Sequence, residues 1–293
     1  MMELVVISGK GGTGKTTLAA SIVALAGRAV AADCDVDAAN LHLVTPHEVI
    51  RREPFTAGKV AVVDPDICTG CGKCFEVCRY SAVQIDTGKA RIDKMACEGC
   101  GVCAYFCPAG AAVMVDRDGG EWFVSKARTG PLIHARLAAG SENSGKLVTI
   151  VRNQARNAAE EAGIDLVVID GAPGIGCPVI SSLSGADAAL VVTEPTLSGL
   201  HDLDRVLGLT RHFSIAAIVA VNRADINEDL AGEIRRLTES AGAGWAGEIR
   251  YDPDVGAAQA AGISVVEYSN GPAAADIGRI WERVRQRLGL EVT

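Results

Sequence analysis

The stretch Leu4-Val-Val-Ile-Ser-Gly-Lys-Gly-Gly-Thr-Gly-Lys-Thr16 decides the fold of this chain. It opens with an apolar run, Leu4–Ser8, that predicts a buried strand, and a glycine-rich turn follows. The pattern then predicts a helix from about Lys15 to Ala26 and a second strand over Ala29–Asp33. A strand, a helix and a strand in this order predict an α/β domain with a parallel sheet covered by helices.

The glycine-rich turn fits the phosphate-binding pattern G-x-x-x-x-G-K-[S/T] between Gly9 and Thr16. Glycines let backbone N–H groups close on phosphate oxygens, and the N-terminus of the next helix adds positive potential. We expect Lys15 to bind the β- and γ-phosphates and the Thr16 hydroxyl to coordinate Mg²⁺. The predicted nucleotide contacts here are Gly9, Gly11, Gly12, Thr13, Gly14, Lys15, Thr16 and Thr17.

Acidic residues follow two of the predicted strands. Asp33-Cys-Asp-Val-Asp37 comes after the second strand, and Asp170 ends a later apolar run. Carboxylates at these places can support Mg²⁺ or accept a hydrogen bond from water near the γ-phosphate. We therefore predict Asp33 and Asp170 as Mg²⁺ residues. Gly171 and Gly174 would let the loop after Asp170 move when the γ-phosphate leaves.

Eight of the ten cysteines form an internal repeat in which C-x₂-C-x₂-C-x₃-C occurs twice. This is the spacing of bacterial two-cluster ferredoxins, in which three cysteines of a run bind one cluster and the fourth binds the other. Structural zinc usually takes paired C-x₂-C arms, so zinc is the weaker interpretation. The predicted ligands are Cys68, Cys71, Cys74 and Cys107 for one [4Fe–4S] cluster, and Cys97, Cys100, Cys103 and Cys78 for the other.

The order of these segments predicts one α/β domain that is split by a small insert. Residues 1–59 and 118–293 form the nucleotide-binding domain, and residues 60–117 form an α+β ferredoxin-like insert. After the insert, strands are expected at 166–170, 189–193 and 215–221, and helices at 200–212, 227–240 and 273–288. The last helix is amphipathic, and we expect its apolar side to pack on the sheet rather than on a membrane.

Several of these motifs together resemble the MinD-superfamily ATPases with an inserted ferredoxin domain. They are the K-G-G-x-G-K-T form of the phosphate loop, the run Asp33–Leu41, the paired cysteine motifs, Glu142-Asn-Ser-Gly-Lys146, and the run Asp170–Pro178. The resemblance covers nearly the whole chain. It implies a mostly parallel sheet with helices on both faces, ATP and Mg²⁺ as ligands, and two [4Fe–4S] clusters.

The resemblance also implies roles for single residues. In these proteins the lysine at the place of Lys10 reaches across a dimer to the partner's nucleotide. Asp35, by position, orients the attacking water. The dimer would form with ATP, either between two copies or with a paralogue. Two interpretations remain for Cys34 and Cys177. They are either small buried side chains or part of a redox or metal-transfer site near the dimer interface.

The residues predicted to contact the base are compatible with guanine and with adenine. Asn222-Arg-Ala-Asp225 is close to the N-K-x-D pattern that reads guanine, whereas the family resemblance favours adenine. Tyr251 and Asp252 are predicted to line the base pocket, with Arg250 where the family usually has proline. The predicted contacts are Asn222, Arg223, Asp225, Tyr251 and Asp252.

Charge, hydropathy and cysteine content indicate where the protein acts and what it binds. The formal net charge is −8, which argues against broad binding to nucleic acid or anionic lipid. The sequence shows no signal peptide and no apolar stretch long enough to span a bilayer, so we expect a cytoplasmic protein without stable membrane insertion. Ten cysteines then indicate metal rather than disulfides.

The leading hypothesis is an ATPase whose dimer rearrangement is coupled to electron transfer through the two clusters. One alternative is an ATPase that assembles or carries iron–sulfur clusters. Another is a positioning switch of the MinD/ParA kind in which the clusters only sense redox state. The sequence does not name the electron donor, the acceptor or the client protein.

Overall fold

The computed structural model describes residues 1–138 and 144–290 of the chain. It divides them into two compact units. The larger unit comprises residues 1–53, 122–136 and 144–290, and the smaller unit comprises residues 54–121 with 137–138. The segment predicted as an insert, residues 60–117, lies inside the smaller unit.

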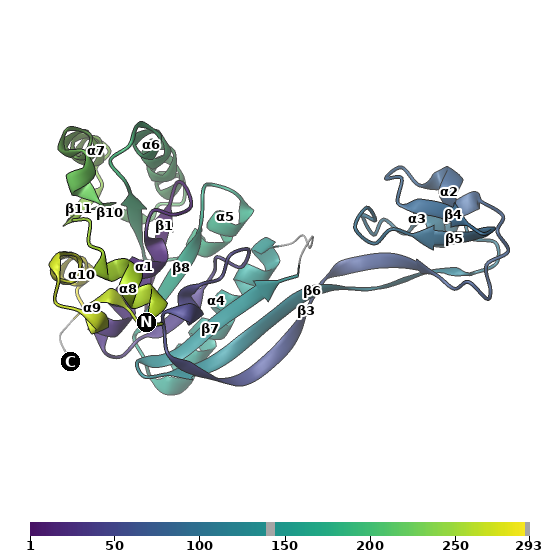
Figure 1. Cartoon of the computed structure of the whole chain (residues 1–293), viewed down its shortest axis with the longest axis horizontal. Helices are drawn as coiled ribbons and strands as arrows, with labels where there is room; N and C mark the ends of the chain where they lie inside the picture. The colour runs from purple at the N-terminus through teal and green to yellow at the C-terminus, as the bar shows by residue number, and fades with distance from the viewer. Residues whose placement is uncertain (139–143, 291–293) are drawn as a thin grey trace. The chain divides into compact units, whose positions relative to one another are not determined.

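The sheet contains nine strands in the order β11-β10-β9-β1-β8-β2-β7-β6-β3 (Figure 1). Every pairing from β11 to β7 is parallel, which confirms the mostly parallel sheet expected from the sequence. The strands are β1 Met2–Ser8, β2 Val30–Asp33, β3 His47–Val63, β6 Ala112–Ala127, β7 Gly130–Leu137, β8 Leu166–Pro173, β9 Ala188–Thr193, β10 Ala216–Asn222 and β11 Gly244–Ile249.

Helices cover both faces of the parallel part of the sheet. One face carries α1 (Lys15–Ala26), α9 (Val265–Tyr268) and α10 (Pro272–Leu288). The other carries α4 (Ser144–Ala162), α5 (Cys177–Leu183), α6 (Leu197–His212) and α7 (Glu228–Ser240). Shorter helices are η1 (Leu41–Leu43), η2 (Ala224–Ile226) and α8 (Asp254–Ala260).

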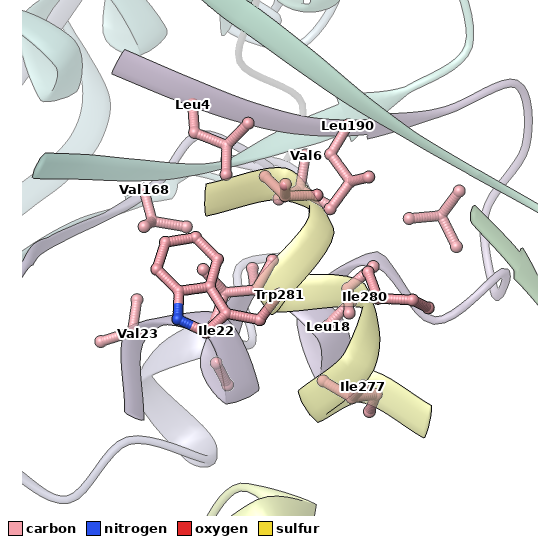
Figure 2. Packing of buried hydrophobic residues seen from close by; sticks show 14 of the residues in the cluster. Leu4, Val6, Leu18, Ile22, Val23, Val168, Leu190, Ile277, Ile280 and Trp281 are labelled. Atoms are coloured by element: carbon pink, nitrogen blue, oxygen red, sulfur yellow. The ribbon is translucent and has the colours of Figure 1, made fainter. Parts of the chain in front are cut away.

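The alternation of side chains along β1 explains the two covered faces. Leu4 and Val6 point into the cluster that α1 and α10 complete, and Trp281 of α10 is buried there (Figure 2). The apolar stripe of the last helix therefore packs on the sheet, as predicted. Among residues 1–138 and 144–290, every helix is too short or too polar to cross a bilayer.

Three strands at one edge of the sheet had no counterpart in the sequence prediction. β6 and β7 are joined by Arg128 and Thr129 and lie next to each other, and β3 pairs with β6 at the edge. Alternation along β3 and β6 is weak, because many of their residues are polar or charged. Their pairing depends on contacts between segments far apart in the chain, which local periodicity does not report.

The smaller unit reflects the cysteine repeat. Each run leads into one short helix, α2 (Lys73–Val77) or α3 (Val102–Tyr105), and β4 (Val83–Asp86) pairs with β5 (Lys89–Ile92) as a hairpin. Gly72 and Gly101 precede the two helices with φ of 74° and 77°, a conformation that favours glycine. The buried core of this unit consists of Val60, Ala61, Cys68, Cys74, Ala82, Val83, Ala90, Cys97, Cys103 and Ala111.

A stack of rings joins η1 to the edge strands in the larger unit. The buried ring of His134 on β7 stacks on His42 at 4.9 Å and on Phe123 at 4.7 Å. Its Nε2 lies 3.3 Å from the Ser125 hydroxyl. Burial, and then the neighbouring His42 and His47, lower the pKa of His134 from 6.5 to about 3. The ring is therefore neutral at physiological pH.

This lowered pKa predicts acid sensitivity of the larger unit. Between pH 6.5 and 3 the unfolded chain binds a proton at His134 that the folded chain does not, so stability is lost as the pH falls. From pH 7 to pH 5 His134 should contribute a loss of about 2 kcal/mol, while the buried carboxyls of this unit whose pKa is raised, Asp33 and Asp170, contribute in the opposite direction. Urea unfolding followed by tryptophan fluorescence measures it, because Trp122, Trp245 and Trp281 all belong to this unit.

The substitution His134→Phe keeps a ring in the stack and removes the titration. Between pH 7 and pH 5 its free energy of unfolding should fall by about 2 kcal/mol less than that of the unaltered protein. The control is His201→Gln, because the His201 side chain is 73% exposed and its loss should leave the difference intact. An equal acid sensitivity in His134→Phe and the unaltered protein would show that His134 is not its source.

Candidate functional site

The phosphate loop lies between the end of β1 at Ser8 and the start of α1 at Lys15. Gly12 and Gly14 have φ of 79° and 95°, so a side chain at either position would strain the loop. A Cβ on Gly14 would also lie 2.4 Å from the Asn222 amide nitrogen. In the part of the chain that the structure describes, no side chain caps the first turn of α1, which leaves its N–H groups available to an anion.

The loop forms one wall of a cavity of about 790 Å³. The other walls come from the segment after β2, the end of β8, and the segments after β10 and β11. Among the predicted residues, those that line this cavity are Gly11, Gly12, Gly14, Lys15, Thr16, Thr17, Asp35, Asn222, Arg223, Tyr251 and Asp252. Its lining does not include Gly9, Lys10, Thr13, Asp33, Asp170 or Asp225 among the described residues.

Thr16 is tied to an acidic cluster beneath the loop. Its hydroxyl lies 2.5 Å from Oδ2 of Asp170 and 2.7 Å from Oδ1 of Asn40. Asp33, which is fully buried beside them, accepts the backbone N–H groups of Asn40 and Leu41 at 2.9 Å each. The structure therefore brings together all three residues predicted to support Mg²⁺.

The electrostatics of this cluster favour a bound cation. Burial raises the pKa of Asp170 to about 7, against the lowering effects of the Thr16 hydrogen bond and the Lys15 charge. Burial, and next Asp170 itself, raise the pKa of Asp33 well above its usual range. Oδ1 of Asp170 is buried and has no hydrogen-bond partner among the described residues. Buried carboxylates need a compensating charge, so hard oxygen ligands at this place fit Mg²⁺.

Asp35 faces the same cavity from the segment after β2. Burial raises the pKa of its carboxyl, while the charge of Lys15 opposes that rise. Lys15 is only 5% exposed. These two side chains are placed so that a phosphate bound to Lys15 would have a carboxylate beside it.

At the other end of the cavity, several of the predicted base contacts have partners within the protein. The Asn222 amide donates to the Thr13 carbonyl at 2.9 Å and so joins this segment to the phosphate loop. Oδ1 of Asp225 accepts the Tyr251 backbone N–H at 2.8 Å. Asp225 thus holds the segment after β11, and the pattern resembling N-K-x-D does not bring its acidic residue to the cavity wall.

Lys10 lies beside the cavity rather than in its wall. Its ammonium group contacts Glu194 after β9 and two hydroxyls at the start of α6. Glu194 was not predicted from the sequence, because one acidic residue after a strand has no diagnostic spacing. Of the motif Glu142–Lys146, Glu142 and Asn143 lie outside the described residues, and Ser144 begins α4.

The cysteines of the smaller unit line two small cavities, with four thiols in each. One contains Cys68, Cys71, Cys74 and Cys107, and the other contains Cys78, Cys97, Cys100 and Cys103. These are the two sets assigned from the repeat. Within residues 1–138 and 144–290, no three His, Cys, Asp or Glu side chains form a site for a single metal ion.

Backbone groups surround two of these thiols. The N–H groups of Ala90 and then Gly70 lower the pKa of Cys68, and those of Ala112 and its neighbours lower the pKa of Cys107. Hydrogen bonds of this kind favour the thiolate, which is the form that ligates iron. Burial instead raises the pKa of Cys74 and Cys103. Four thiols in each cavity are the donor set that a [4Fe–4S] cluster takes, so the composition of each cavity fits such a cluster.

The two remaining cysteines differ in environment. Cys34 is fully buried, and burial followed by the charge of Asp33 raises the pKa of its thiol. This suits a small buried side chain rather than a reactive thiolate. Cys177 is exposed at the start of α5.

Comparison with known proteins agrees with this geometry. The sequence model of the CobQ/CobB/MinD/ParA nucleotide binding domain matches residues 4–265. The chain belongs to this family. It is thus a P-loop ATPase of the MinD/ParA group, as the resemblance of the phosphate loop implied.

Three proteins similar to this MinD/ParA-family chain bear on its function or its fold. An uncharacterised protein of Methanocaldococcus jannaschii is 35% identical over 78% of this chain and 80% of its own length. An iron–sulfur cluster carrier protein of Pyrococcus abyssi is 27% identical over 49% of this chain and 53% of its own length. The septum site-determining protein MinD of Pyrococcus horikoshii, solved with Mg-ADP, shares the fold with a TM-score of 0.58 at 18% identity, covering 99% of this chain and 98% of that one.

Proposed function

We propose that this MinD/ParA-family ATPase couples ATP binding, hydrolysis and dimer rearrangement to electron transfer through two [4Fe–4S] clusters. Residues 60–117 would form the inserted ferredoxin-like module. The observation that carries the proposal is the pair of four-cysteine cavities in a chain that also has a complete nucleotide cavity.

The nucleotide half follows from the acidic cluster and the phosphate loop. Lys15 would bind the phosphates, and Thr16 with Asp170 would hold Mg²⁺, whose charge offsets the buried carboxylates. Asp35 would accept a hydrogen bond from the attacking water. Asn222, Arg223, Tyr251 and Asp252 would form the base end of the site, with adenine favoured because Asp225 is engaged by the Tyr251 backbone.

The cluster half follows from the composition of the smaller unit. Its core is built from alanine, valine and cysteine, so little apolar surface is available to hold the unit together. Small domains of this kind usually need a metal or disulfides. When bound, a [4Fe–4S] cluster stores and passes single electrons. The cysteines and the N–H groups around them would hold each cluster and set its potential.

A dimer completes the proposed ATPase. Lys10 lies next to the cavity and not in it, which leaves this residue for the nucleotide of a second chain, either a copy or a paralogue.

The alternative function is delivery of iron–sulfur clusters. The similarity to the Pyrococcus carrier over half of each chain favours it. Against it, four thiols from two separate runs line each cavity, and several of them are buried, which suits retention more than release. Incubation of the loaded protein with an apo-ferredoxin separates the two functions, because only a carrier should give up most of its iron.

Cluster content is the first test. Protein purified without oxygen should contain about eight irons and about eight acid-labile sulfides per chain, as expected for two cubanes. Iron and sulfide analysis together with EPR after reduction measures it. The substitution Cys177→Ser should leave the content unchanged. Protein that holds zinc and no sulfide would contradict the cluster assignment.

Coupling between nucleotide and clusters is the second test. Midpoint potentials of the clusters should shift by about 40–130 mV between nucleotide-free protein and protein with a non-hydrolysable ATP analogue, which corresponds to a coupling of about 1–3 kcal/mol. Reduction should change nucleotide affinity by the same free energy, because coupling is reciprocal.

The matched control for this titration is Lys15→Ala, which should retain the clusters and show no shift with nucleotide. Asp35→Asn should show the full shift with ATP itself, because hydrolysis is slowed. Identical midpoint potentials of the clusters in all nucleotide states would refute the coupling. The prediction that the chain binds two clusters would still stand.

A further inference from the structure

One edge of the nine-stranded sheet is open. β3 has β6 on one side, and within residues 1–138 and 144–290 no strand pairs with its other side (Figure 1). Alternate residues of an edge strand direct their N–H and C=O groups away from the sheet, where a further strand can bind them. All residues of β3 from Glu48 to Arg52 are exposed, so little of the chain covers this part of the edge.

Two prolines bound this part of the edge. Pro46 lies just before β3, and Pro54 lies within it. Proline has no N–H group, so it interrupts pairing along a strand. The residues between the prolines are H-E-V-I-R-R-E, with Ile50 in the middle and three residues on either side of it. A second strand that binds this edge would therefore pair with a segment centred on Ile50.

The charges of this segment are complementary to themselves. Edge strands are usually protected by charges, above all by lysine, that repel a second strand. Here Glu48 and Arg52 have opposite signs and lie at equal distances along the strand from Ile50. When two copies run antiparallel about Ile50, Glu48 of each copy lies directly opposite Arg52 of the other. Opposite charges in directly opposite positions stabilise an antiparallel pair.

Symmetry restricts the alternatives. Directly opposite residues of antiparallel strands share a face of the sheet, so a two-fold axis must place one residue opposite its own counterpart. Centres at Glu48, Arg51 or Arg52 would each place two like charges together, which destabilises the pair. A centre at Val49 would bring no opposite charges together. A centre at Ile50 avoids both defects, and the Ile50 side chain, 65% exposed in the single chain, would be covered by its counterpart.

Contacts on both faces anchor β3 to its own sheet. The Arg51 guanidinium lies 4.8 Å from the centre of the Trp122 ring, and its Nη2 donates to Oε1 of Gln154 on α4 at 2.9 Å. The guanidinium of the next residue, Arg52, lies 5.7 Å from the centre of the Phe123 ring. The strand is thus ordered before a second strand arrives, which lowers the entropy lost on pairing.

The open edge lies away from the phosphate loop. Five strand spacings separate β3 from β1, the strand that leads into that loop. At about 4.8 Å for each spacing, this distance is about 24 Å. A second chain paired with β3 would therefore not occupy the phosphate loop.

We propose that the open edge of β3 binds the same edge of a second copy of this chain, antiparallel and centred on Ile50. The paired segment is only about 20 Å long, so the association is reversible and depends on protein concentration. It needs no nucleotide and uses a different interface from the ATP-dependent dimer proposed above. A chain with two separate two-fold interfaces links copies into larger assemblies. If the proposed ATP-dependent dimer also forms, nucleotide should therefore convert the β3 dimer into larger species.

Sedimentation velocity of the full-length, cluster-loaded chain without nucleotide tests the association. The fraction of dimer should rise with protein concentration. Glu48→Arg should raise the dissociation constant of the dimer about tenfold or more, because two pairs of opposite charges become pairs of like charges. Arg52→Glu should do the same. The control Glu233→Arg makes the same charge change at an exposed position of α7 and should leave the dissociation constant unchanged.

A mixture of the two variants tests the register. In a mixed dimer, the arginine introduced by Glu48→Arg lies opposite the glutamate introduced by Arg52→Glu, and the remaining Arg52 and Glu48 lie opposite each other. The mixture should therefore associate about as tightly as the unaltered chain, although neither variant does so alone. A fluorophore on one variant reports the mixed dimer in sedimentation. The double variant, with both changes in one chain, should also regain the dimer.

The outcomes separate this interface from the proposed function. An unaltered chain that stays monomeric up to about 1 mM, or a mixture that does not associate, overturns the proposal. A nucleotide-free dimer that both single variants form as tightly as the unaltered chain also overturns it, because its interface then lies elsewhere. Lys10→Ala should keep the nucleotide-free dimer. A β3 dimer that forms normally, without any additional association when nucleotide binds, would overturn the ATP-dependent dimer alone.

Discussion

Replacing Lys15 with alanine should weaken ATP binding by about a hundredfold and bring hydrolysis to background. Hydrogen bonds to charged groups contribute about 1.5–3 kcal/mol each, and every 1.4 kcal/mol is a tenfold change in affinity. Lys15 is 5% exposed and its charge also offsets Asp35 and Asp170. Its removal would leave those carboxylates without the cation that lies nearest to the proposed phosphate site.

Lys10→Ala should behave differently, because Lys10 does not line the cavity of its own chain. It should retain nucleotide affinity within a fewfold, while dimerisation and hydrolysis fall by about a hundredfold or more, as when a positioned transition-state donor is lost. Nucleotide titration, sedimentation velocity and phosphate release measure the three quantities. Lys126→Ala, an exposed lysine in the same unit, is the control and should change none of them. Hydrolysis at the normal rate by Lys10→Ala would refute the role of this lysine in the dimer.

Loss of the clusters should unfold the smaller unit and spare the larger one. Cys74 and Cys103 belong to different cavities and are both buried in the core of the smaller unit. The double substitution to serine removes one ligand from each cavity and places hydroxyls in a core that otherwise contains only alanine, valine and cysteine. The apolar area that remains is small for a unit of this size, so we expect the metal-free unit to lose its fold.

Limited proteolysis checks this expectation. In the double variant, cleavage should occur within residues 60–117 in minutes, whereas the unaltered protein should resist for hours under the same conditions. Nucleotide binding should persist, because the cavity belongs to the larger unit. Cys177→Ser is the matched control, since Cys177 lies outside the repeat and should not affect resistance. A double variant that is free of iron and as resistant as the unaltered chain would show that the clusters do not hold this unit together.

Features that depend on short spacing could be predicted from the order of the residues alone. A strand, a glycine-rich turn and a lysine-led helix follow from local sterics and from the need to close backbone N–H groups on phosphate, so α1 was predicted with its observed ends. The repeat of the cysteines sorted their thiols into the two sets that line the two cavities. The phosphate-loop pattern is local, and the cysteine pattern occurs twice. Neither requires knowledge of contacts between distant segments.

Contacts between segments far apart in the chain could be recognised only in the folded structure. Glu194 meets Lys10 only because β9 lies beside β1 in the sheet, and Asp225 turns to the Tyr251 backbone only because β10 lies beside β11. The ring of His134 likewise lies on His42 only after β7 has paired with β2. A side chain's partner across strands is set by sheet order and register, which the residue types near it in sequence do not encode.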